Sequence, residues 1–241
     1  MSDEAPSRPA GDSPLSRLTG VFFSPVRTFE AVARRPTWIA PLLLWAAASL
    51  AVTAALLPRI DYERAVREQL EKSSRTMSEG EVESLVEKQK SIGGVIGYIL
   101  AVVSPALITA VVAGVLFLAF KAFGRDLSFR QGFGITAHAF LPGILAALLL
   151  IPVVMGRETV DPSGLGDLLR SNPGFLVDRK EAPGLHSLLQ SFDLFSLWTA
   201  ALLVIGFAVA TRSSRAQTAA IVLSLWGLWI LGKTGFAILV G

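Results

Sequence analysis

The stretch IGGVIGYILAVVSPALITAVVAGVLFLAF, residues 92–120, has no charged side chain over its 29 residues. A helix needs about 20 apolar residues to cross the roughly 30 Å hydrocarbon core of a bilayer, so this run is long enough to span a membrane and to tilt within it. Its apolar residues do not alternate with polar ones, which argues against a strand of a membrane barrel. The stretch therefore predicts a transmembrane helix.

Four further runs of the chain share this apolar character. They cover residues 38–57, 132–156, 194–211 and 216–240. Of the whole chain, 52% is hydrophobic and 17% is charged, whereas a soluble domain carries roughly 25% charged residues. Five such runs leave too little polar chain to cover them with a water-soluble surface. We therefore predict an all-α, polytopic transmembrane bundle of about five spans.

The charged residues between the runs predict its orientation. Basic residues are dense in the N-terminal segment and in the short loops at residues 121–134 and 212–215. The two longer loops, residues 58–91 and 157–193, carry mixed charge. Because short cytoplasmic loops are enriched in Lys and Arg, we expect a cytoplasmic N-terminus, an outside C-terminus and a multi-pass location in the cell membrane.

Two segments precede the first span. Residues 1–20 are rich in Pro, Ser and Asp, and we expect a disordered cytoplasmic tail. Residues 21–37 predict an interfacial amphipathic helix, with Ser24 as its cap and Pro25 at its first position. This helix either docks a partner or lipid, or only anchors the first span. The remaining residues, 38–241, form the five-span domain.

Helix starts and loop helices follow from local patterns. The capping-box pattern S-x-x-Q/E begins at Ser78, Ser128 and Ser214. The first long loop predicts helices over residues 61–74 and 79–90, the second of which continues into the span that follows. In the second long loop an apolar stripe at helical spacing predicts a short helix on the outer membrane surface. Its members are Leu185, Leu188, Leu189 and Phe192.

Residues that perform chemistry are sparse. The chain has no cysteine, and neither His138 nor His186 has the spacing of a metal site. Phosphate-binding and nucleophile-elbow motifs are missing, as is the basic block that nucleic acid requires. We therefore expect no catalytic residue, cofactor, metal or nucleic-acid partner. No Asp or Glu lies within the first, second, third or fifth run, and Asp193 lies at the outer edge of the fourth. Proton-coupled transporters generally need buried carboxylates, so this pattern weakens the hypothesis of proton-coupled transport.

The third span carries the most notable polar group. His138 is followed by Pro142 and Gly143, and a proline here releases the carbonyl four residues earlier and bends the helix. The histidine either hydrogen-bonds a neighbouring helix or binds a ligand or relays protons. Lys233, in the fifth span, is expected to extend to the membrane surface. The candidate functional or helix-packing residues are His138, Pro142, Gly143, Asp193, Trp198 and Lys233.

Small residues repeat every four positions in three spans, which predicts faces of close helix approach and a tight bundle. The three sets are Ala47, Ala51 and Ala55; Ala106, Ala110 and Gly114; and Ala139, Gly143 and Ala147.

Three stretches carry a resemblance to a known family. FSPVRTF at residues 23–29 is similar to an F-x-P-x-x-T-F pattern before a first span. FRQGF at 129–133, leading to AHAFLP at 137–142, is similar to a basic loop that feeds an A-Y-S-x-x-P helix. FDLFSLW at 192–198, Gly206 and SSRA at 213–216 are similar to a D-x-F-x-x-W, Gly, S-x-x-A run. In this order they resemble the Yip1 domain family of small five-span proteins.

The chain also departs from that family. His138 and Ala139 stand where Tyr and Ser are usual, and the D-L-x-G-P motif of eukaryotic members is missing. The role of those members with prenylated Rab GTPases in vesicle traffic is therefore not carried over, and bacterial-type members generally have no assigned function. The resemblance implies a non-enzymatic membrane protein that contacts lipid, other membrane proteins or its own copies, in membrane organisation or a trafficking-like process. The alternative is a small-solute channel or transporter gated at the kink between His138 and Pro142.

Overall fold

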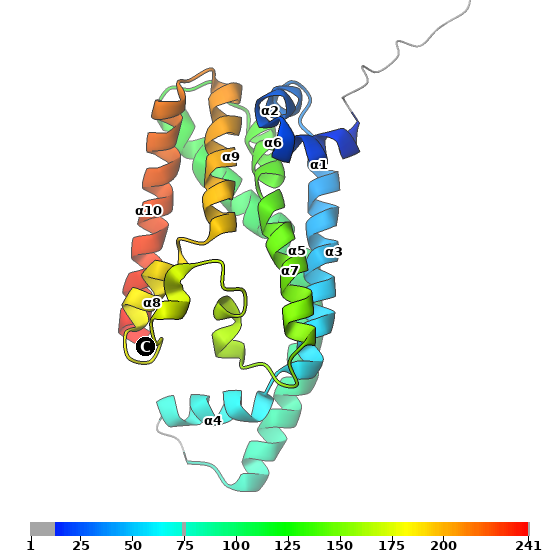
Figure 1. Ribbon diagram of the computed structural model, residues 1–241, viewed down its shortest axis with the longest axis vertical. Helices are drawn as coiled ribbons and strands as arrows, with labels where there is room; N and C mark the ends of the chain where they lie inside the picture. Colours follow the sequence, from blue (N-terminus) through cyan, green and yellow to red (C-terminus); the bar gives the residue numbers. More distant parts are fainter. Residues whose placement is uncertain (1–12, 74–75, 241) are drawn as a thin grey trace, which may run out of the picture. The chain divides into compact units, whose positions relative to one another are not determined.

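The computed structural model describes residues 13–73 and 76–240, and its regular elements are helices (Figure 1). These two ranges contain no β-strand, only a parallel bridge between Ile60 and Val160. The α-helices are α1 (Pro14–Phe23), α2 (Pro25–Arg34), α3 (Ile39–Leu56), α4 (Tyr62–Lys72), α5 (Glu79–Ala122), α6 (Phe129–Ala139), α7 (Leu141–Met155), α8 (Pro183–Gln190), α9 (Leu194–Thr211) and α10 (Arg215–Val240). The 3₁₀ helices are η1 (Leu57–Arg59), η2 (Pro162–Asp167) and η3 (Pro173–Leu176).

Within the described residues, five helical segments are long and apolar enough to cross a membrane. They are Ile39–Arg59, Glu79–Ala122, Phe129–Met155, Leu194–Thr211 and Arg215–Val240. Each contains most or all of one predicted apolar run. The prediction of an all-α bundle of five spans is therefore confirmed.

Helix α5 continues well beyond its apolar run. Its 44 residues correspond to about 66 Å, roughly twice the thickness of the hydrocarbon core. The charged helix predicted over residues 79–90 is thus the first part of the same element. The capping pattern at its start forms as expected, because the backbone N–H of Ser78 donates to Glu81 Oε2 over 2.8 Å.

The third span is interrupted near its middle. Helix α6 ends at Ala139 and α7 begins at Leu141, which leaves Phe140 between them. Pro142 occupies the first turn of α7, where the missing N–H of a proline costs no hydrogen bond. The interruption lies where the proline predicted a kink.

The N-terminal segment differs from its prediction. Instead of one helix over residues 21–37, it forms α1 and α2 with Ser24 between them. Helix α1 begins inside the expected disordered tail because Ser13 Oγ accepts the N–H of Ser16 at 3.1 Å and Pro14 takes the first helical position. The rest of that tail, residues 1–12, lies outside the described residues. Ser24 precedes Pro25 as expected, but its side chain forms no capping hydrogen bond in α2.

The chain divides into two compact units. The first contains the residues up to Leu44, Ala106–Pro142 and Ser196–Trp229; the second contains Trp45–Pro105, Gly143–Phe195 and the residues from Ile230 onward. In the first unit Phe120 stacks on Phe207, with ring centroids 4.9 Å apart and both side chains fully buried.

The grouping of the loops follows the predicted sides. In the first unit, Arg125 Nη2 donates to Gln217 Oε1 at 3.1 Å, which joins the first short basic loop to the first turn of α10, directly after the second. In the second unit, the N–H of Asp61 donates to the carbonyl of Val160 at 3.1 Å, which joins the two long loops. Loops expected on one side of the membrane are therefore in contact with each other.

Most of the predicted four-residue repeats of small residues do not mark close approaches, although Ala139 of the third set is fully buried. Ala47 and Ala51 are exposed, and a Cβ added at Gly114 or Gly143 would meet no described atom within 4 Å. The prediction was wrong at these four positions, because alanine-rich spans produce four-residue repeats by composition alone. The tight contacts occur instead at glycines outside the repeats, which position the site described next.

Candidate functional site

The N-terminal helix pair, α1 with α2, is seated on α6 and α9 within the first unit. Phe29 of α2 is fully buried beside Gly206 of α9. A Cβ at Gly206 would lie 3.0 Å from Phe29 Cδ1 and closer still to Ile135 Cγ2. Since real Cβ atoms do not approach so closely, only glycine at this position lets the phenyl ring reach its place.

Gln131 joins the helix pair to α6 through hydrogen bonds. Its Oε1 accepts the backbone N–H and the hydroxyl of Ser128, at 3.0 and 2.9 Å, and completes the predicted capping box. Its Nε2 donates to the carbonyl of Ala33 at the end of α2, at 3.1 Å. One side chain therefore begins α6 and holds the last turn of α2.

Arg17 fixes α1 from inside. Its side chain is buried, and Nη1 donates to the carbonyl of Arg35 at 2.8 Å and to Thr37 Oγ1 at 3.0 Å. A buried charge is stable only when it is hydrogen-bonded, so these acceptors place α1 across the link between α2 and α3. Arg17 was not among the predicted site residues.

The opposite faces of the helix pair point outward. Leu15, Thr19 and Phe23 lie four residues apart on α1, and the two apolar ones are 71% and 86% exposed. Arg27, Glu30 and Arg34 form the exposed face of α2. The pair thus presents an apolar stripe and a charged stripe while its other sides are buried in protein.

His138 lies in the interior of the first unit. It is 1% exposed, and its Nδ1 is 2.8 Å from the carbonyl oxygen of Gly134 in the same helix. Pro142 is also buried, whereas Gly143 is exposed. The described contact of His138 is therefore with its own helix and not with the neighbouring helix that was expected.

Trp198 makes an aromatic contact with α1. Its ring lies edge-to-face with that of Phe22, at a centroid distance of 5.3 Å and an angle of 77°. Such pairs contribute about 0.5–1.5 kcal/mol beyond their buried area. Trp198, a residue of the third family-like stretch, thus helps to seat the N-terminal helix pair.

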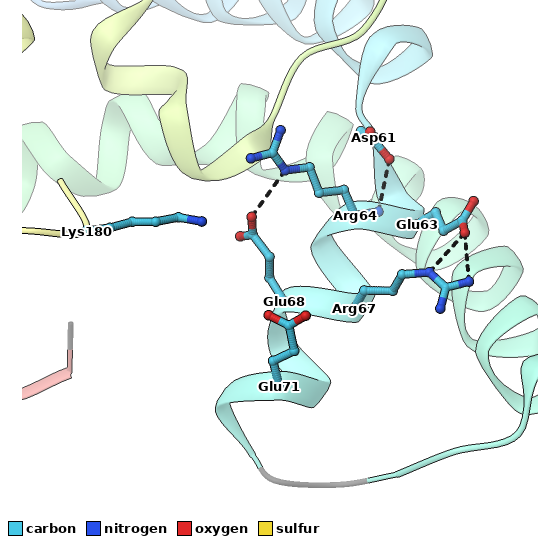
Figure 2. Close-up of a pocket in the computed structure, with 7 residues that line it drawn as sticks. All are labelled: Asp61, Glu63, Arg64, Arg67, Glu68, Glu71 and Lys180. Carbon is cyan, nitrogen blue, oxygen red and sulfur yellow. Dashed lines mark hydrogen bonds and ion pairs between the residues drawn. The ribbon is translucent and has the colours of Figure 1, made fainter. Parts of the chain in front are cut away.

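A charged cleft of about 440 Å³ lies along α4 in the second unit (Figure 2). Figure 2 shows Lys180 reaching from the second long loop toward the pair formed by Arg64 and Glu68. The cleft is lined by four acidic and three basic side chains: Asp61, Glu63, Glu68, Glu71, Arg64, Arg67 and Lys180. Its charges are nearly balanced, so it has no strong field of one sign to attract an ion.

Ion pairs within the cleft join α4 to its neighbours. Arg67 contacts Glu79 of α5 at 2.9 Å, and Arg64 contacts Asp161 of the second long loop at 3.5 Å. The hydrogen bond that Arg67 donates to Glu79, followed by the one that it donates to Glu63, raises the pKa of the Arg67 guanidinium, which therefore stays charged. Exposed pairs of this kind stabilise little, and the cleft fits a solvated charged surface.

The polar knot is a set of hydrogen-bonded residues within the second long loop. Nε2 of His186 lies 2.9 Å from Asp167 Oδ1, and Gln190 Nε2 donates to the same oxygen at 3.3 Å. Ser171 donates its hydroxyl to Asp193, whose other oxygen caps α9 by accepting the N–H of Phe195 at 2.9 Å. Asp193 is therefore placed by loop and helix together.

Another cavity, of about 290 Å³, lies among α3, α5 and α7 in the second unit. Its polar lining consists of the hydroxyls of Ser49, Thr53 and Ser104, and the rest is aliphatic or glycine.

Lys233, elsewhere in this unit on α10, is half-buried and forms no ion pair with any residue that the structure describes.

No group of three or more His, Asp or Glu side chains in the described ranges could hold a metal ion.

The sequence analysis missed Arg17, Gln131 as a link to α2, Gly206 as a packing position, and the His186–Asp167 contact. The pair Ser13–Pro14 was a usable signal for α1. The other features depend on contacts between distant residues, for which local spacing gives no signal.

Comparison with known proteins gives one finding. The family model described as the Yip1 domain matches residues 19–235, nearly the whole chain. No curated protein and no solved structure matches the chain. The matched range contains all three stretches that suggested the resemblance.

Proposed function

Because the chain belongs to the Yip1 domain family, we propose that it is a non-enzymatic integral protein of the cell membrane that acts through contacts with lipid or other membrane proteins. Its N-terminus is cytoplasmic and its C-terminus is outside in this proposal. The contacts serve membrane organisation or a trafficking-like process.

The observation that carries this proposal is the N-terminal helix pair. Its inner faces are held by Phe29, Arg17 and Gln131, so the pair is fixed to the bundle. Its outer apolar residues, Leu15 and Phe23, are exposed. A fixed helix pair, with an apolar outer stripe on α1 and a charged one on α2, suits binding to a membrane surface or to an amphipathic partner.

The channel alternative has one observation in its favour, the interruption of the third span at Phe140. Two features favour the contact role instead. The ring of His138 is buried against Gly134 of its own helix. The cavity among α3, α5 and α7 has a mostly aliphatic lining, which suits an acyl chain better than a hydrated solute.

A photo-crosslinking experiment tests the contact role. A photoreactive amino acid replaces Phe23, which is exposed, or Val21, which is fully buried in the same helix, and membranes are irradiated without detergent. We expect Phe23 to give adducts with lipid or with a discrete membrane protein, and Val21 to link only within the chain. An absence of intermolecular adducts at Phe23, with efficient linking at Val21, would contradict the proposal.

A flux assay tests the alternative. Proteoliposomes that contain the wild type or His138→Ala are challenged with a panel of ions and neutral osmolytes, and shrinkage is followed by light scattering. We expect both to match protein-free liposomes. Flux through the wild type that the substitution abolishes would establish the channel instead.

A further inference from the structure

Between residues 172 and 187, the second long loop buries several polar residues and exposes apolar ones, beside the exposed charges of Asp178, Lys180 and Glu181. Among its buried residues are Asn172, His186 and Ser187, which are at most 7% exposed. Phe175 and Leu176 of η3 and Leu185 of α8 are 47%, 72% and 49% exposed. A loop folded for water has the reverse arrangement, because exposing apolar side chains to water is unfavourable by about 25 cal/mol per Å².

The inner polar groups are satisfied within the loop. His186 and Gln190 contact Asp167, Asn172 Oδ1 accepts the N–H of Gly174 at 2.9 Å, and Ser191 Oγ donates to the carbonyl of Ser187 at 2.9 Å. Non-helical backbone at membrane depth requires such internal partners, since lipid tails offer none. The loop therefore meets a condition for lipid contact that a solvated loop does not need.

The apolar side of the loop continues onto a predicted span. Figure 1 shows α8 beside the C-terminal turns of α10. A Cβ at Gly184 would lie 2.5 Å from Ile238 Cγ1, so the glycine lets the two helices touch. In the same part of α10, Phe236 and Leu239 are 66% and 85% exposed. Exposed apolar side chains are therefore present on both of these touching helices, the span and the loop helix.

Charge does not explain this face. Arg170 lies over the ring of Phe175, at 5.7 Å from its centroid, but Arg179 and Lys180 are flanked by Asp178 and Glu181. Such a nearly neutral segment has little electrostatic attraction to anionic lipid headgroups. The apolar side chains would provide the attraction, and they do not require an anionic lipid.

We propose that the segment from η3 to α8, residues 173–190, is a monotopic element that inserts Phe175, Leu176 and Leu185 into the headgroup–acyl boundary of the leaflet on the loop side. The polar knot holds it folded while its apolar face enters the lipid. The inference rests on the proposed membrane function and adds the lipid interface as the partner of this loop.

Because the chain contains no cysteine, single-cysteine labelling tests the insertion. Leu176→Cys and Leu185→Cys carry an environment-sensitive fluorophore in phosphatidylcholine proteoliposomes. Glu181→Cys is the control in the same loop, and Leu107→Cys, 59% exposed in α5, is the control in a span. Quenching by a lipid-borne nitroxide is compared with quenching by aqueous iodide.

We expect the labels at 176 and 185 to be quenched several-fold more by the nitroxide than the label at 181, with the opposite order for iodide. High salt should leave this order of quenching unchanged. A reversal of the order by salt would contradict insertion by apolar side chains. The inference would be overturned if the labels at 176 and 185 behaved like the label at 181, or if protein shielded them from both quenchers. In that case, quenching of the label at 107 by the nitroxide would leave the proposed membrane function standing. If the nitroxide failed to quench even position 107, both proposals would fall.

Discussion

At the scale of single residues, one glycine and one arginine seat the N-terminal helix pair. Gly206 leaves room for Phe29 and Ile135, and Arg17 donates to Arg35 and Thr37. Gly206 was noted only as part of a family-like stretch, and neither packing role was predicted from sequence, because a glycine in an apolar run and an arginine in a basic tail are both unremarkable by composition. His138 was identified because a lone histidine in a span is conspicuous, yet its sequence did not reveal that its contact is with its own helix.

Replacing Gly206 with alanine should destabilise the first unit by about 1–3 kcal/mol, since the new methyl group overpacks against Phe29 and Ile135. Gly227→Ala in α10 is the matched control, because a Cβ there meets nothing within 4 Å and alanine favours the helix. Thermal unfolding in detergent measures both. Equal melting temperatures for the two variants would show that Gly206 is not a packing constraint.

Arg17→Met should loosen α1, because methionine fills similar space without donating to Arg35 or Thr37. Hydrogen bonds from charged groups contribute about 1.5–3 kcal/mol, so the amides of α1 should exchange with deuterium faster. Arg27→Met, on the exposed face of α2, should have no such effect. Unchanged exchange in α1 of the Arg17 variant would count against its role.

At the scale of elements, the spans and their caps were predictable because hydrophobic runs and capping boxes are local signals. The continuation of the charged helix into α5 was also expected. Helix α1 was missed although Ser13 and Pro14 carried a start signal, because the proline-rich tail was interpreted as disordered. The packing of α2 on α6 and α9 was missed because an amphipathic pattern predicts that one face is buried but does not identify the helix that covers it.

Gln131→Glu separates capping from docking. Glutamate keeps the acceptor for Ser128 but cannot donate to the carbonyl of Ala33, so α6 should stay capped while α2 loosens. Gln217→Glu is the matched control, since a carboxylate there still accepts from Arg125. We expect faster amide exchange in α2 for the first variant alone. Equal protection of α2 in both variants would contradict the docking role of Gln131.

At the scale of the whole molecule, the family match over residues 19–235 and five apolar helical segments agree on a multi-pass membrane protein. The alternation of five spans predicted which loops share a side. A hydrogen bond joins the two long loops, and another joins the first short basic loop to the first turn of α10. Neither composition nor hydropathy predicted the inverted burial of the second long loop. That feature depends on which residues meet after folding, as Asp167 and His186 do.

The most direct test of the account is the accessibility of cysteines placed at Glu30, on the N-terminal helix pair, and at Glu181, in the second long loop. A maleimide that cannot cross membranes is added to cells whose cytoplasmic membrane is intact, and then to opened membranes. The account predicts labelling of position 181 in both samples and of position 30 only after opening. Labelling of both positions in intact cells, or of both only after opening, would contradict an odd number of membrane crossings between them.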